Sequence, residues 1–237
     1  MQALPSLRLA ANLNSMITGS QTLEQAERAI AGFDVAHHVV DPGGLLGLDP
    51  LRASPLDEAL SALGAVEREA WFLCLPAPGV LAPLRGPAAL NHAALEHGEA
   101  VVASTAGVGL VPIRVGAAVQ WRVFEANRPF APETPYEAER LLNETVLAAA
   151  AALARLDVAA GNRPGLNAGI ALAPGYGRRQ LATAERAGQL IAVCDAALAD
   201  EGGGISAYEM ERRGRELRQL RAAARIALTS AVSWLIT

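Results

Sequence analysis

Lysine is missing from this chain: all 20 basic residues among the 237 are arginine. About a dozen lysines would be expected at this length from average usage. Their absence excludes mechanisms that need a lysine amine, such as Schiff-base chemistry with pyridoxal phosphate. It also excludes the phosphate-binding lysines of P-loop proteins and protein kinases. A GC-rich coding sequence favours arginine and alanine over lysine, so the bias does not by itself make the arginines functional.

Aromatic and charged residues are also scarce. Aromatics make up 4% and charged residues 19% of the chain, against 51% hydrophobic residues. Alanine, leucine and valine must therefore form the core, which favours closely packed helices. The net charge of −4 makes nucleic acid an unfavourable partner, because phosphate contacts require a positive surface. Low charge with high apolar content indicates burial in an oligomer, so we expect a homo-oligomer.

Long apolar runs are absent as well. No window approaches 18 uninterrupted apolar residues, and the mean hydropathy is +0.23. The N-terminal segment is interrupted by Arg8, Asn12 and Asn14, which does not fit a secretory leader. We therefore expect a soluble, cytoplasmic protein of bacterial type without membrane association.

Few residues suit a metal. Cys74 and Cys194 lie far apart in apolar surroundings, which indicates buried thiols and no disulfide. The four histidines are His37, His38, His92 and His97. The first two are neighbours on a predicted strand and point to opposite faces, and the other two lie about 140° apart on a predicted helix. We therefore expect neither a metal site nor a bound cofactor.

The order of elements predicts the α/β class, with α+β as the alternative. Predicted helices cover residues 5–18, 22–32, 54–64 and 87–97, and predicted strands cover 33–40, 70–75, 99–103, 109–114 and 118–126. The first three strands alternate with helices, which favours parallel strands joined by crossovers. The last two form a hairpin, so a mixed sheet of about five strands is expected. Pro112 would place its strand at an edge of the sheet.

After residue 130 the pattern becomes helical. Thr134, Pro135 and Glu137 combine an N-cap, a proline at the first helical position and a capping-box glutamate. Three helices are expected, beginning at Thr134, at Arg178 (178–199) and at Ser206 (206 to about 235). The proline-rich joint sets a boundary between a mixed α/β sheet region, 1–130, and an α-helical region, 131–237, expected to pack as one compact unit.

Three groups of residues are candidate sites. If the early strands are parallel, their ends bring together His37, His38, Asp41 and Ser104, although Ser104 lacks the strand-turn-helix context of a nucleophile. Gly175, Gly177, Arg178 and Arg179 lead into a helix, so backbone N–H groups and two guanidinium groups could bind a phosphate or carboxylate. Arg218, Arg221 and Arg225 form a stripe without i,i+4 acidic partners on the last helix. This stripe and Trp234 are candidates for a surface that binds an acidic protein partner.

Two functions from different classes remain open. The first is a non-catalytic interaction or regulatory protein that self-associates through its helical region. Trp234 near the end of the chain must bury its ring, either in the protein's own core or at a dimer interface. The second is a small enzyme or binding protein that acts on an anionic metabolite, with arginines that bind the anion.

Overall fold

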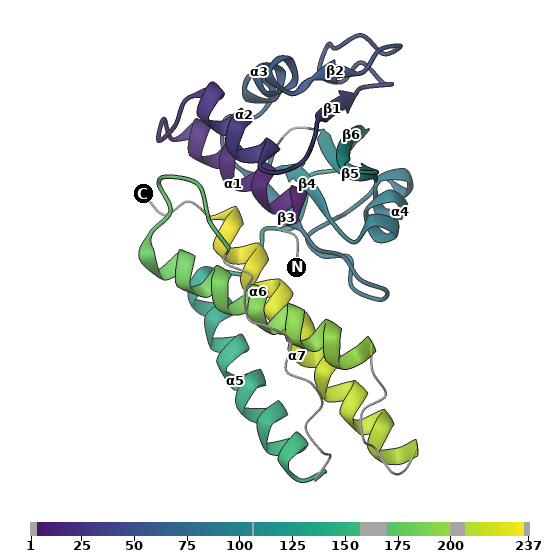
Figure 1. Cartoon of the computed structure of the whole chain (residues 1–237), viewed down its shortest axis with the longest axis vertical. Coiled ribbons are helices and arrows are strands. Elements are labelled where there is room, and N and C mark those ends of the chain that lie inside the picture. The colour runs from purple at the N-terminus through teal and green to yellow at the C-terminus, as the bar shows by residue number, and fades with distance from the viewer. Residues whose placement is uncertain (1–3, 106, 157–169, 200–206, 235–237) are drawn as a thin grey trace. The chain divides into compact units, whose positions relative to one another are not determined.

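The structure, a computed structural model, describes residues 4–105, 107–156, 170–199 and 207–234 (Figure 1). These residues form two compact units. The sheet unit contains residues 4–132, 172–177 and 232–234. The helical unit contains residues 133–156, 170–171, 178–199 and 207–231. The sheet unit thus includes two short segments from the second half of the sequence. The boundary at residue 130, and the packing of both regions into one body, stay predictions.

A six-stranded mixed sheet forms the sheet unit's centre. Its strands are β1 (His37–Val40), β2 (Ser54–Pro55), β3 (Trp71–Cys74), β4 (Ala100–Ala103), β5 (Val108–Val115) and β6 (Ala118–Glu125). Their order is β2-β1-β6-β5-β4-β3, and β1 and β6 are its parallel neighbours. The α/β class with a mixed sheet is confirmed, with six strands where about five were expected. The additional strand is β2, which pairs with β1 in a segment that was predicted to begin a helix.

The expected parallel arrangement of the first three strands is wrong. β3 runs antiparallel to β4, and the β5–β6 hairpin separates β4 from β1. The strands of a tight hairpin pair with each other locally, so β5 and β6 enter the sheet together. They separate strands that the alternating sequence pattern had placed side by side. As a result β3 ends at the opposite side of the sheet from the ends of β1 and β4.

Pro112 lies in an interior strand, which corrects its expected position at an edge. β5 pairs with β6 along its whole length, but the last pair that it forms with β4 on the proline side is Val101 with Leu110. Because β4 is only four residues long, the β4 ladder has ended before Pro112. The missing proline N–H therefore costs no hydrogen bond to β4.

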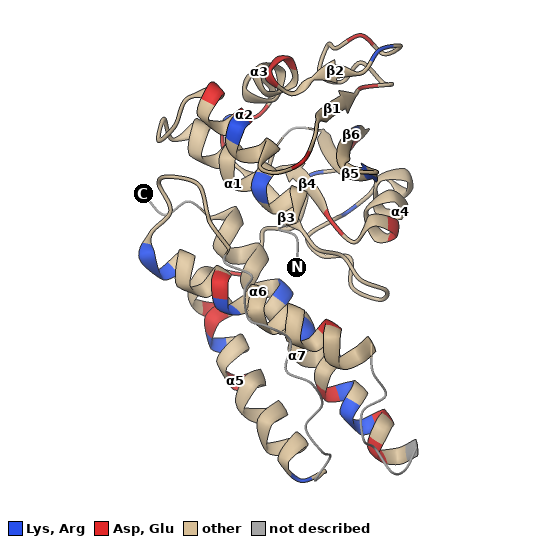
Figure 2. Cartoon of the chain, in the orientation of Figure 1, with Lys and Arg blue, Asp and Glu red and all other residues tan. Residues whose placement is uncertain are grey.

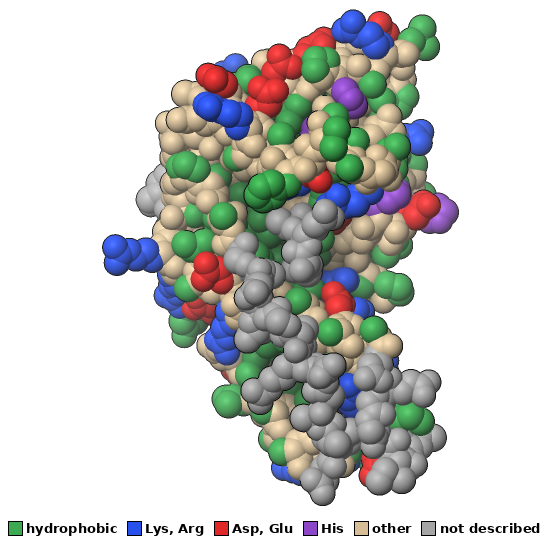
Figure 3. Space-filling view, viewed as in Figure 1, with side chains coloured by type: hydrophobic (Ala, Val, Ile, Leu, Met, Phe, Trp, Pro, Cys, Tyr) green, Lys and Arg blue, Asp and Glu red, His purple; other side chains and the backbone are tan. Residues whose placement is uncertain are grey.

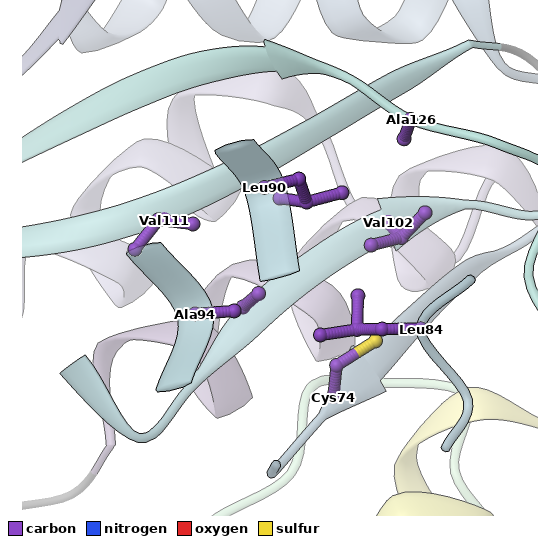
Figure 4. Close-up of a cluster of buried hydrophobic side chains, with 8 residues drawn as sticks. Cys74, Leu84, Leu90, Ala94, Val102, Val111 and Ala126 are labelled. Atoms are coloured by element: carbon purple, nitrogen blue, oxygen red, sulfur yellow. The ribbon is translucent and has the colours of Figure 1, made fainter. Parts of the chain in front are cut away.

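Four helices accompany the sheet: α1 (Pro5–Ile17), α2 (Leu23–Ala31), α3 (Leu56–Val66) and α4 (Ala88–His97). Figure 4 shows the apolar cluster between α4 and the sheet, in which Leu90 and Ala94 of the helix meet Val102 and Val111. α1 packs against β3 and β4 and against α2. All residues of β3 and β4 are buried, as expected for continuous apolar runs that are covered on both faces.

The outer edge of β3 is closed by side chains in place of another strand. The Trp71 N–H donates to Asn14 Oδ1 at 2.7 Å, and Asn14 Nδ2 donates to the Trp71 carbonyl at 2.9 Å. The Leu73 N–H donates to Ser233 Oγ at 3.0 Å. An unpaired strand edge is a template for aggregation, so these two buried side chains satisfy the edge strand and protect it.

The helical unit contains α5 (Pro135–Ala154), α6 (Arg178–Ala199) and most of α7 (Ala207–Ser233). Three C-terminal helices were expected, and no strand follows Glu125 in the part of the chain that the structure describes. Both hydrogen bonds of the predicted capping box at Thr134 and Glu137 are present. The helix expected over 206–235 begins and ends with residues outside the described ranges. None of the described helices is both long and apolar enough to cross a bilayer.

Small side chains line the interior of the helical unit. Buried positions include Ala184, Ala187 and Gly188 of α6, and α7 buries a series of alanines and leucines. A Cβ at Gly188 would overlap the Cδ1 atom of Ile170, so any larger residue here would force the Ile170 side chain to shift. Alanine and leucine thus form much of the buried interior of this unit, in line with the alanine-rich composition.

Candidate functional site

A cavity of about 460 Å³ opens in the sheet unit beside the edge strand β3. Its walls come from the end of α1, the start of β3, the end of β4, the loop after β6 and the end of α7. All lining residues belong to the sheet unit, so the cavity is complete within one compact unit. Its volume lies in the range of small-molecule sites.

An aromatic wall forms one part of this cavity. The ring centroids of Phe72 and Trp234 lie 5.7 Å apart. Trp234 Nε1 donates to the Pro132 carbonyl at 3.3 Å, which orients the indole. The other two tryptophans, Trp71 and Trp121, are fully buried, whereas Trp234 is half-buried. Trp234 therefore has ring surface that a flat ligand can contact.

Most neutral polar side chains that line the cavity already form hydrogen bonds within the protein. Asn14 binds the backbone of Trp71 and also donates to the Val232 carbonyl at 3.2 Å. Ser233 Oγ accepts from β3, and Ser104 Oγ donates to Glu67 Oε2 at 3.3 Å. These side chains hold the walls in place.

The buried Glu67 anchors two loops that border the cavity. Its Oε2 accepts from the Thr105 N–H at 2.8 Å and from Thr105 Oγ1 at 2.7 Å, besides Ser104. Its Oε1 accepts from the Glu69 N–H at 2.7 Å. Glu67 thus fixes the approach to β3 and the turn after β4 through these hydrogen bonds.

Two charged side chains at the cavity, Arg128 and Glu69, are exposed. Within the described residues neither of them takes part in an ion pair. Arg128 presents a permanent, planar charge with donors spaced for a carboxylate or phosphate. The cavity therefore combines an aromatic wall, apolar surface from Ile17 and Pro129, and two exposed groups of opposite charge, Arg128 and Glu69.

The histidine proposed for catalysis, His37, has a structural environment. Its Nε2 lies 3.1 Å from Asp34 Oδ2, and Trp121 Nε1 donates to its Nδ1 at 3.0 Å. Because an indole N–H only donates, Nδ1 carries no proton and the ring proton is on Nε2. Burial lowers the pKa of His37 below its ordinary value, so the imidazole is neutral. Both ring nitrogens are engaged in the fold, and neither is open to a substrate.

Asp34 was not identified from the sequence, yet it is the centre of this network. It forms ion pairs with Arg8 and with Arg114 besides its contact with His37. Burial alone would raise the pKa of Asp34, but the hydrogen bonds and charges of these partners outweigh it and lower the pKa. The network ties α1 to the start of β1 and to β5.

The other proposed catalytic residues lie apart from one another. His38 is exposed on the face of β1 opposite to His37. The buried Asp41 accepts from the Leu45 and Leu46 N–H groups at 2.9 and 2.7 Å, and so shapes the turn after β1. Of the proposed group, only Ser104 lines the cavity. The expected meeting does not occur: β1 and β4 end on the same side of the sheet, but β6 and β5 lie between them.

The proposed anion site at Gly175, Gly177, Arg178 and Arg179 is partly occupied by the protein itself. Arg179 forms a forked ion pair with Glu139 of α5, and this lowers the pKa of Glu139. Gly175 adopts a φ of +95°, a backbone region that favours glycine. Arg178 is exposed and has no ion-pair partner among the described residues. Anion binding at this place stays a prediction.

The arginines of the α7 stripe were expected to lack acidic partners, but one of them forms an ion pair with a neighbouring helix. Arg221 binds Asp195 of α6 at 2.8 Å. Arg225 is half-buried, and burial lowers its pKa. Arg218 is the exposed member, whereas Trp234 belongs to the cavity wall. A partner surface built on Arg218, Arg221, Arg225 and Trp234 stays a prediction.

Of the residues that line the cavity, only Ser104 and Trp234 were candidates from the sequence; Asn14, Phe72 and Arg128 are among those that were not. Asn14 looked like an interruption of an apolar helix, and Phe72 like an ordinary core residue. Arg128 precedes Pro129 in the proline-rich joint, and this joint was the only signal that marked its neighbourhood. No group of three metal-ligating side chains lies together among the described residues.

Fold and site together define a protein with an α/β sheet unit, which holds a cavity of about 460 Å³, and an alanine-rich helical unit. Residues 6–138 match the family described as "Rv1486c-like protein, N-terminal domain", and residues 136–229 match "Rv1486c-like protein, C-terminal domain". The chain therefore belongs to the Rv1486c-like family. No curated protein and no solved structure matches the chain significantly.

Proposed function

We propose that this protein is a non-catalytic regulatory protein that binds a small anionic molecule in the cavity of the sheet unit. The observation that carries the proposal is the exposed Arg128, without an ion-pair partner in the described chain, at a cavity walled by Phe72 and Trp234. An arginine fork binds a carboxylate or phosphate in two parallel hydrogen bonds. The two rings favour a flat apolar body attached to that anion.

An enzyme that acts on the same ligand is the second candidate. Glu69 supports it, because it places an exposed carboxylate at the same cavity. The environment of Ser104 favours binding without catalysis: its hydroxyl donates to Glu67, and no described histidine lines the cavity. A reaction that wild-type protein carries out and Glu69→Gln does not would favour the enzyme.

We propose that the protein resides in a bacterial cytoplasm. We also propose that it self-associates. Cys74 and Cys194 are free and buried, which suits a reducing compartment. We also propose that the exposed Arg218 contributes to a surface that binds an acidic protein partner. Nucleic acid is not proposed, because the net charge is −4 and arginines lie among carboxylates and apolar side chains on the face seen in Figure 3.

Thermal shift with a panel of benzoate, phenyl phosphate and inorganic phosphate tests ligand binding. A ligand at about 100 times its dissociation constant stabilises the folded state by about 2.7 kcal/mol, which raises the Tm by roughly 5–10 °C. We expect the aromatic anions to act at lower concentrations than inorganic phosphate, because only they can contact the aromatic wall.

Matched arginine variants locate the binding site. Arg128→Ala should abolish the shift, whereas Arg68→Ala, at an exposed arginine that does not line the cavity, should retain it. Ligand should also change the fluorescence of wild-type protein and not that of Trp234→Phe, since the other two tryptophans are buried. Absence of any shift at millimolar ligand, or equal loss in both arginine variants, would overturn the proposal.

A further inference from the structure

Helix α5 has two apolar faces. One of them, with Ala138, Leu142 and Ala149, is buried in the helical unit. On the opposite face Leu147 is 72% exposed, and Ala148 and Ala151 are exposed beside it. The face of a surface helix that points away from the core ordinarily carries polar side chains. The second half of α5 departs from this pattern.

Charge is missing from this part of α5. Residues 145–154 contain no charged side chain, and Figure 2 shows the corresponding stretch of α5 without blue or red. Glu144 stands at one end of the stretch and Arg155 at the other. At 100° per residue, both lie on the same face as Ala148 and Ala151. The exposed part of α7 differs, because it presents Glu211, Arg215 and Arg218.

We propose that this face of α5 binds the same face of a second copy of the chain, with the two helices antiparallel. The two-fold axis passes between Ala149 and Ala150. Ala148 of each copy then lies opposite Ala151 of the other, and Glu144 of each copy lies opposite Arg155 of the other. This inference rests on the proposed self-association and identifies its surface and its register.

The charges select both the partner and the direction. Glu144 and Arg155 are exposed, and in the described chain neither takes part in an ion pair. A parallel pair would place glutamate opposite glutamate and arginine opposite arginine, which is unfavourable. An antiparallel pair forms two identical ion pairs, one on each side of the alanines. A two-fold interface uses the same patch on both copies, so a second copy supplies the complementary charges by symmetry.

The alanines permit a close approach of the two helices, and Leu147 supplies most of the apolar surface. The paired stretch of twelve residues is about 18 Å long. That is short for an interface, so we expect a weak dimer with a dissociation constant of roughly 10–300 µM.

Charge exchange tests this arrangement. Wild-type protein is examined by sedimentation equilibrium from about 10 µM to about 1 mM at low salt. Glu144→Arg places two arginines opposite each other at both ends, and Arg155→Glu does the same with glutamates. Each single variant should raise the dissociation constant roughly tenfold or more. The double variant Glu144→Arg with Arg155→Glu restores both ion pairs in reverse and should return the constant to within about threefold of wild type.

A leucine control separates the α5 face from general effects of added charge. Leu147→Glu should give a monomer, whereas Leu51→Glu, at a leucine that is 96% exposed in the sheet unit, should dimerise like wild type. Circular dichroism confirms that each variant is folded. A monomeric wild type overturns both the self-association and this surface. A wild-type dimer that is insensitive to the charge variants, or one strengthened by Glu144→Arg alone, overturns the antiparallel α5 pair and leaves self-association standing.

Discussion

Replacement of Asn14 by leucine should unfold the sheet unit more readily than its modest change in size suggests. The Asn14 amide supplies both an acceptor and a donor to the backbone of Trp71, at 2.7 and 2.9 Å. Leucine occupies a similar volume but offers neither group. The N–H and the carbonyl of Trp71 would then be buried without partners at the edge of the sheet.

The expected loss follows from these two groups. A buried donor or acceptor without a partner costs about 1–3 kcal/mol, so two of them cost about 2–6 kcal/mol. The third backbone partner of Asn14, the Val232 carbonyl, adds little because Tyr176 Oη still donates to it at 2.6 Å. Against a total free energy of unfolding of about 5–15 kcal/mol, such a loss is a large fraction.

Urea denaturation followed by tryptophan fluorescence measures this loss. All three tryptophans lie in the sheet unit, so the signal reports on that unit. Ser233→Ala removes only the acceptor of the Leu73 N–H and should cost about 1–3 kcal/mol. Ser61→Ala, at an exposed helical serine, should stay within about 0.5 kcal/mol of wild type. If Asn14→Leu loses no more than the Ser61 control, the reasoning about the closed edge is refuted.

Two further predictions concern packing and pH. Gly188→Ala should destabilise the helical unit by about 1 kcal/mol or more, because the new Cβ overlaps Ile170. Gly64→Ala in α3 meets no atom within 4 Å, so it should stabilise the protein by about 0.5–1 kcal/mol. Thermal melts followed by circular dichroism measure whether each variant raises or lowers the Tm. Burial raises the pKa of Glu99, which accepts from the Ser6 N–H at 2.8 Å, to about 7 from 4.5. The folded state therefore binds more protons than the unfolded chain between these values, and this contribution to stability is lost as the pH rises through about 7. Relative to wild type, Glu99→Gln should gain roughly 2–3 kcal/mol between pH 4.5 and pH 8 in urea titrations, and parallel pH profiles of the two proteins would contradict this.

Elements specified by neighbouring residues were predictable. The capping box at Thr134 with Glu137 forms as the sequence analysis predicted, because donor and acceptor lie three residues apart on one chain segment. The structure has a second capping box of the same spacing at Thr22 with Gln25. The continuous apolar runs of β3 and β4 indicated strands covered on both faces. The β5–β6 hairpin needed only a short turn.

The order of the strands was not predictable in the same way. Alternating helices and strands are compatible with several strand orders. The observed order results from the β5–β6 hairpin, because both of its strands lie between β1 and β4. The short β2 depends on backbone pairing between His38 and Pro55, for which no local pattern exists. Pro112 is tolerated in an interior strand because the neighbouring strand β4 is short. The residues around Pro112 do not indicate the length of β4.

The candidate site shows the same division. Ser104 and Trp234 were singled out from the sequence for unrelated reasons, and the fold places both at one cavity. His37 and Asp41 have residue types suited to catalysis, but hydrogen bonds to Trp121 and to the turn after β1 engage them in the structure.

By itself the sequence determined which chemistry is open to this protein and where its helices and covered strands form. A chain without lysine, with few aromatics and with permanent arginine charges excludes whole reaction classes before it folds, and hydrogen bonds between near neighbours set the helix ends. Tertiary structure alone decided which side chains remain free. Arg128 has no ion-pair partner among the described residues while Arg179 and Arg221 have one, because the distance between charges depends on how segments remote in sequence are brought together.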